Sequence, residues 1–120
     1  MTLYDEIGKE FVEKAITEFY IRAFEDRMIG HFFFEKNREY ITRMQIDFAT
    51  SALGGPRNYV GKSLVEAHRT LNMRLPHFKR RQVLMAEVLD ELGLRDDLKQ
   101  KWLDLEESLR PLILGTAKSC

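Results

Sequence analysis

The stretch that decides the fold reads QIDFATSALGGPRNYVGKSLVEAHRTLNMRLPHF, residues 45–78. A helical pattern runs into it and ends at GGP, residues 54–56, because two glycines and a proline do not continue a helix. A loop is predicted over residues 54–63, and a short helical segment that contains His68 follows it. The stretch therefore places a histidine after a long loop, between two predicted helices.

His68 lies on the apolar face of its segment, which raises the question of its role. Residues three and four apart are neighbours on a helix, so Leu64, Val65 and Leu71 share a face with His68. One interpretation is a half-buried histidine with a backbone partner, since histidine is often partly buried. The other is a ligand to a metal or to haem iron, because neutral imidazole binds iron and an apolar wall suits a flat, apolar macrocycle.

The rest of the chain predicts an all-α protein with four substantial helices and this one shorter segment. Residues 1–8 form a lead-in, Gly30 ends the first long helix, Pro76 suits the first turn of the third, and Pro111 kinks or ends the fourth. Each helix carries an apolar stripe at helical spacing. The four stripes are Phe11, Val12, Ala15, Ile16, Phe19, Tyr20, Ala23 and Phe24; Tyr40, Ile41, Met44, Gln45, Phe48, Ala49, Ala52 and Leu53; Phe78, Gln82, Met85, Ala86, Leu89 and Leu92; and Leu98, Trp102, Leu105, Leu109 and Leu112.

Composition sets the broad class of the protein. The 120 residues are 44% hydrophobic and 32% charged, which predicts one soluble globular domain over residues 1–120. Lys+Arg and Asp+Glu both number 19, so neither a nucleic-acid partner nor a membrane is expected. The single cysteine, Cys120, excludes an internal disulfide framework. No apolar run spans a membrane and no secretory signal is visible, so we expect a cytoplasmic monomer or weak dimer.

Two further polar residues lie on faces that are otherwise apolar. Tyr20 belongs to the first stripe and Gln45 to the second, and an unpaired buried amide costs about 1–3 kcal/mol. Tyr20 could be a core tyrosine with a satisfied hydroxyl, and Gln45 could lie at the rim of the core. Alternatively, both could line a cavity whose other side holds His68. No two histidines have the i, i+4 spacing of a helical zinc pair.

Several markers in order resemble the truncated haemoglobin family, and its group I in particular. They are EFY ending at Tyr20, the FFF corner at residues 32–34, and the spaced residues Q..FA..ALGGP..Y.G....EAH..LN....HF of 45–78. The resemblance extends from LYDEIG through ELGL, which is nearly the whole chain. It implies a truncated globin with a two-over-two helical sandwich around haem b.

The resemblance also implies a role for individual residues. His68 would be the proximal ligand of the haem iron, and Phe33 would stack on the haem. Tyr20 would be the distal tyrosine that donates a hydrogen bond to the gas ligand, with Gln45 as its partner. Ile41 falls where many longer globins have a distal histidine. Further haem contacts would come from Phe48, Tyr59, Leu64, Met73, Leu75 and Phe78.

The chain departs from the family pattern at three places. Gly8 is followed by Lys9 where the family usually has a second glycine. Met44 stands where a basic residue that can pair with a haem propionate is usual. Arg81 falls where an apolar haem contact is expected, so either it reaches a propionate or solvent, or its helix is rotated.

The function that the resemblance implies is reversible binding of O2, CO and NO at haem iron, including oxygen transport. One alternative is a nitric oxide dioxygenase that converts NO and O2 to nitrate and needs a reductase for turnover. A second alternative is a haem-based gas or redox sensor. A haem-free helical interaction domain is the remaining class, and it predicts no haem spectrum that depends on His68.

Overall fold

The structure is a computed structural model that describes residues 1–57, 66, 68 and 72–114. Every regular element in these residues is a helix, as predicted. The described helices are α1 (Leu3–Ile7), α2 (Lys9–Glu25), the 3-10 helix η1 (Gly30–Phe33), α3 (Arg38–Ala52), α5 (Leu75–Glu91), α6 (Asp96–Ser108) and α7 (Arg110–Leu114). None of them is long and apolar enough to cross a membrane.

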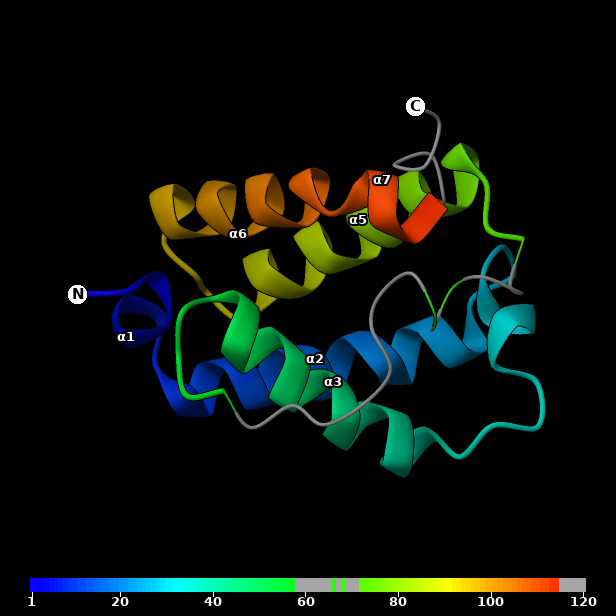
Figure 1. Cartoon of the computed structure of the whole chain (residues 1–120), viewed down its shortest axis with the longest axis horizontal. Coiled ribbons are helices and arrows are strands. Elements are labelled where there is room, and N and C mark those ends of the chain that lie inside the picture. The colour runs from blue at the N-terminus through cyan, green and yellow to red at the C-terminus, as the bar shows by residue number, and fades with distance from the viewer. Residues whose placement is uncertain (58–65, 67, 69–71, 115–120) are drawn as a thin grey trace.

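The long helices form two layers of two. Helices α2 and α3 lie side by side in one layer, and α5 and α6 lie side by side in the other (Figure 1). Helix α2 also packs against α5 and therefore joins the layers. The predicted two-over-two sandwich is confirmed.

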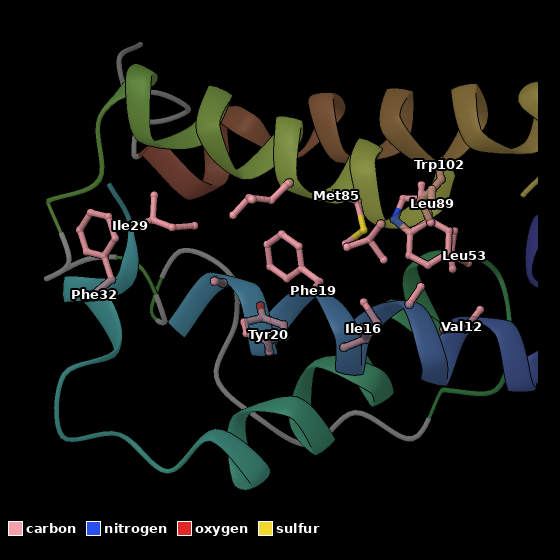
Figure 2. Close-up of a cluster of buried hydrophobic side chains, with 14 residues drawn as sticks. Val12, Ile16, Phe19, Tyr20, Ile29, Phe32, Leu53, Met85, Leu89 and Trp102 are labelled. Carbon is pink, nitrogen blue, oxygen red and sulfur yellow. The ribbon is translucent and has the colours of Figure 1, made fainter. Parts of the chain in front are cut away.

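The main core forms where α2 meets α5 and α6. Val12, Ile16 and Phe19 recur three or four residues apart on α2, so they share one face, and all three are buried. Phe19 extends toward α5, and Met85 and Leu89 of α5 lie in the same cluster as Trp102 of α6 (Figure 2). The apolar stripe predicted for α2 is confirmed, including the burial of Tyr20.

The predicted lead-in of residues 1–8 contains a helix that the sequence analysis did not predict, since residues 3–7 form α1. The side chain of Thr2 accepts a hydrogen bond from the backbone N–H of Asp5 at 3.1 Å, and the Asp5 carboxylate accepts one from the backbone N–H of Thr2 at 3.3 Å. This reciprocal capping box satisfies two backbone donors that the start of a helix leaves free. The pattern Thr-x-x-Asp was the signal in the sequence.

The prediction that Gly30 ends the first long helix is wrong, because α2 ends at Glu25 and Gly30 opens η1. The Asp26 carboxylate accepts hydrogen bonds from the backbone N–H groups of Met28 and Ile29 at 3.0 and 3.1 Å. It also pairs with Arg80 of α5 at 2.7 Å. An aspartate that bonds nearby backbone donors competes with the helix, so the chain turns four residues early.

Helix α3 ends at the predicted GGP. Gly54 has φ 99°, a left-handed conformation that favours glycine, and a Cβ on Gly55 would lie 2.7 Å from the Tyr4 ring. The stripe predicted for α3 is wrong at Tyr40, whose side chain is 56% exposed. The rest of the stripe up to Ala52 is half-buried rather than fully buried.

The remaining helix boundaries follow the sequence closely. Pro76 lies in the first turn of α5, as predicted, and Gly93 follows its end with φ 84°. Pro111 lies in the first turn of α7, so the predicted interruption of the last helix is confirmed. The apolar stripe of α5 is broader than predicted, because Leu84 and Val88 are also buried. Gln82, which was predicted in the stripe, is half-buried and donates a hydrogen bond to the Glu107 carboxylate.

Replacing Leu89 by alanine tests the packing between the layers. Leu89 is fully buried, so Leu89→Ala removes apolar contacts and leaves a cavity that costs about 2–5 kcal/mol. We expect the free energy of unfolding, measured by urea titration, to fall by that amount. Val83→Ala on the same helix is the control, because Val83 is 46% exposed. Equal effects of the two substitutions would contradict this account of the core.

The contact between Asp26 and Arg80 predicts a dependence of stability on pH. The hydrogen bond from Arg80 holds the pKa of Asp26 below its ordinary value. Its stabilising contribution is therefore present above the unfolded-state pKa of about 3.9 and is lost as pH falls through the lower folded-state pKa.

We expect Asp26→Asn to lower the free energy of unfolding at pH 7 by about 1–3 kcal/mol. The difference in the free energy of unfolding between the variant and the unsubstituted protein should become smaller when the urea titration is repeated near pH 3. Asp104→Asn, which removes an exposed carboxylate of α6, controls for the general effect of lost charge. If the loss of unfolding free energy in Asp26→Asn stayed constant with pH, the stabilising role of the ionised Asp26 carboxylate would be contradicted.

Candidate functional site

Two neighbouring hollows share one wall, and the predicted polar residues lie on it. Tyr20 of α2, Gln45 of α3, His68 and Arg81 of α5 line both hollows. The volumes of the two hollows, including the space at their solvent-open entrances, are about 660 and about 800 Å³. The structure thus brings together the three polar residues that the sequence placed on apolar faces, and it adds a fourth.

Four of the eight other predicted contact residues also line a hollow. Phe48 lines the first, and Phe33, Ile41 and Met73 line the second. Among the described residues, the rest of the first lining is Ile16, Ala49, Ala52, Leu53, Trp102, Leu105, Glu106, Leu109 and Ile113. The rest of the described lining of the second hollow is Phe19, Ile29, Phe32 and Lys36.

Two of the predicted contact residues are not brought to these walls. Leu75 and Phe78 are absent from both linings, since Leu75 is 41% exposed and Phe78 is fully buried. Tyr59 and Leu64 lie outside the described residues, as do Val65 and Leu71 of the His68 face. The haem contacts predicted for these positions stay predictions.

Aromatic packing fixes the position of Tyr20. Its ring meets Phe19 edge-on at 4.9 Å between centroids and Phe33 edge-on at 5.8 Å, a favoured geometry for aromatic pairs. Phe33 is in turn stacked on Phe24 at 4.6 Å. Burial raises the pKa of Tyr20, and the nearby Arg81 partly opposes this effect. The hydroxyl is therefore protonated at neutral pH and can donate a hydrogen bond.

A buried charged group beside Tyr20 was not predicted as part of the site. Arg81 Nη1 donates to Glu106 Oε1 at 2.8 Å, and Trp102 Nε1 donates to Glu106 Oε2 at 3.0 Å. The Arg81 and Glu106 side chains are 19% and 10% exposed. Arg81 also lies over the Phe19 ring, 4.9 Å from its centroid. It therefore pairs with a carboxylate of α6 rather than extending into solvent.

The charge of Arg81 is stable in this setting. Burial lowers the pKa of Arg81, but Glu106 and Tyr20 more than offset that effect, so the pKa lies above its ordinary value. The sequence contained a signal for the pairing of Arg81 with Glu106. Glu106 follows Trp102 by four residues and so lies on the same face of α6. A carboxylate on a buried face needs a cationic or hydrogen-bonding partner, and Arg81 was a cation at a position where an apolar residue was expected.

The residues present fit a flat apolar macrocycle with a central metal. His68 offers an imidazole nitrogen, the usual ligand from globins to haem iron. Phe33, Ile41, Phe48 and Met73 supply apolar side chains on the same walls. Among the described residues, no three His, Cys, Asp or Glu side chains gather as a set that could hold a metal ion directly. An imidazole set among apolar side chains suits a metal that is held within a cofactor.

Comparison with known proteins gives a consistent result. The family model described as bacterial-like globin matches residues 2–114. The group 1 truncated hemoglobins of Tetrahymena pyriformis and Tetrahymena thermophila are 35% and 32% identical over 115 residues, covering 95% of this chain and 95% of each relative. The crystal structure of the truncated hemoglobin from Tetrahymena pyriformis in its Fe(III) form is similar with a TM-score of 0.90 at 32% identity. That likeness covers 95% of this chain and 98% of the other.

Proposed function

The chain belongs to the bacterial-like globin family as a truncated haemoglobin of the group 1 kind, and from that membership we propose that it holds haem b through His68 and reversibly binds O2, CO and NO. Membership of the family implies haem and gas binding. The proposal adds the haem type, the ligands and the residues. The observation that carries it is the meeting of Tyr20, Gln45 and His68 on the walls of the same two hollows.

The residues of the pocket would have separate roles in holding the haem and in binding the gas. When bound, haem supplies the iron centre at which a diatomic gas coordinates. His68 would hold the cofactor through a ring nitrogen, while Phe33, Ile41, Phe48 and Met73 would contact its apolar surface and exclude water. Tyr20 and Gln45 would donate hydrogen bonds to a ligand that gains negative charge on binding.

Tyr20 is the stronger candidate for the principal donor, because its ring is held between Phe19 and Phe33 and its hydroxyl is protonated at neutral pH. The same donors serve O2 transport, gas sensing and the reaction of O2 with NO. Reversible gas binding is the step that all three share. A nitric oxide dioxygenase would add a requirement for a reductase that restores the iron after each turnover.

The experiment that tests the function is the visible spectrum of the protein reconstituted with hemin. We expect a Soret band that shifts on reduction and again on addition of CO or O2. His68→Ala should change the band and speed the loss of haem to an acceptor protein, because the ring nitrogen is removed. His31→Ala is the matched control, since His31 is exposed and lines neither hollow. A protein without a Soret band, or one indifferent to His68→Ala, would contradict the proposal.

The role proposed for Tyr20 predicts a change in the rate of O2 release. A hydrogen bond to a charged group contributes about 1.5–3 kcal/mol, and each 1.4 kcal/mol is tenfold. Tyr20→Phe should therefore raise the O2 dissociation rate, measured by stopped flow, by about 10- to 100-fold. Tyr40→Phe removes the hydroxyl of an exposed tyrosine and should leave the rate unchanged. An unchanged rate in Tyr20→Phe would show that Tyr20 is not the donor.

A further inference from the structure

We propose that Arg81 determines the ligand preference of this pocket: its guanidinium, held by Glu106, places a positive charge on the wall that it shares with Tyr20 and Gln45 and favours small anions over neutral ligands. The inference rests on the proposed function, because it concerns the same cavity. It assigns the pocket a ligand class, namely monovalent anions that accept hydrogen bonds. Arg81 would be a specificity-determining residue in addition to Tyr20 and Gln45.

The hydrogen bonds around Glu106 hold Arg81 in place. Each carboxylate oxygen of Glu106 has a partner, Arg81 at 2.8 Å and Trp102 at 3.0 Å. Trp102 is buried in the main core, so the carboxylate is anchored to a rigid part of the fold. A guanidinium has five N–H donors in a fixed plane, and the bond to Glu106 uses one of them. Because Arg81 lines both hollows, its other donors can serve a ligand bound there.

The charge of Arg81 also acts on Tyr20. Arg81 and Tyr20 line the same two hollows, and the nearby guanidinium opposes the rise in the Tyr20 pKa that burial causes. A guanidinium has hydrogen-bond donors and no acceptor, so Arg81 cannot accept the hydroxyl hydrogen of Tyr20. The hydroxyl hydrogen is then left for another acceptor. A ligand in the hollow that offers a negative atom would receive that hydrogen.

The charges on the walls favour the same class of ligand. Glu106 lines the first hollow, where it balances Arg81. The second hollow is lined by Arg81 and Lys36, and its described lining contains no carboxylate. Charges act more strongly where water is scarce, because the effective dielectric constant is lower than in solution. The second hollow, which also contains Gln45 and His68, is therefore the cationic part of the site.

A purely structural role for Arg81 makes a different prediction. Buried ion pairs are often replaceable by well-packed apolar residues at little cost in stability. If Arg81 only balances Glu106, then removing both charges should leave ligand binding unchanged, or weaken all ligands alike. If Arg81 sets the preference, then only the anion should lose affinity.

The test compares fluoride with CO in the 120-residue chain reconstituted with haem. Fluoride bears a full negative charge and accepts hydrogen bonds without donating them, whereas CO is neutral. Titrations followed by absorbance give the fluoride dissociation constant of the ferric protein and the CO dissociation constant of the ferrous protein. The variants are Arg81→Met and the double variant Arg81→Met with Glu106→Gln. The double variant keeps an acceptor for Trp102 and leaves no unpaired buried charge.

The expected result is a selective loss of anion binding. The dissociation constant for fluoride should rise at least about tenfold in both variants, while that for CO changes less than about threefold. Arg80→Met is the matched control, because Arg80 precedes Arg81 on α5 and pairs with Asp26 at 2.7 Å, and it lines neither hollow. Its fluoride affinity should match that of the unsubstituted protein.

Three results would overturn the proposal, and each is distinct. Unchanged fluoride affinity in variants with a normal Soret band would show that Arg81 does not act on the ligand. Equal losses for fluoride and CO would show that Arg81 only supports the shape of the pocket. An unsubstituted protein that takes up no haem would overturn the proposed function at the first step, and this inference with it.

Discussion

The packing of α2 against both α3 and α5 is the constraint on which the rest of the structure depends. Phe19 and Tyr20 are consecutive residues that link the core to the cavity. Phe19 enters the core against α5, while Tyr20 lines both hollows together with Gln45 of α3. Their rings are in edge-on contact at 4.9 Å. The core that stabilises the fold therefore also fixes the hydroxyl that faces the cavity.

The core and the cavity are linked a second time through the ion pair. A buried carboxylate is costly unless its partners are all in place, and Glu106 meets this condition with Arg81 on one oxygen and Trp102 on the other. Trp102 packs with the residues of α2 and α5, and Arg81 lies over the Phe19 ring. Phe19 thus contacts two of the polar residues of the pocket wall, Tyr20 and Arg81, and positions them relative to each other.

The sequence predicted those features of the fold that depend on periodicity and on local breakers. The stripe of α2, the stop at GGP and the role of Pro76 follow from local chemistry that acts within a few residues. The early end of α2 was missed because Asp26 is fixed partly by Arg80, a contact between residues distant in the sequence.

For the site, as for the fold, the sequence predicted the features that depend on the spacing of residues within one helix. Tyr20, Gln45 and His68 stood out because polar residues on apolar stripes need a reason, and the structure brings all three to the same walls. Arg81 stood out as well, but its partner Glu106 belongs to another helix, 25 residues away. Periodicity identifies the face on which a residue lies, but pairing across helices depends on how the helices pack. The family resemblance assigned a role to His68 that its apolar face alone left open between ligand and core residue.

The incomplete burial of α3 is the strongest physical argument that a ligand occupies the cavity in the functional protein. Ile41, Phe48 and Ala49 line the hollows, and no α3 side chain is fully buried. An amphipathic helix gains about 25 cal/mol for each Å² of apolar surface removed from water, and α3 realises only part of that gain against α2. A flat apolar cofactor in the hollows would cover the remainder. Binding to the folded state alone also stabilises that state by mass action, so the cofactor would complete the core on the α3 side while His68 holds its metal.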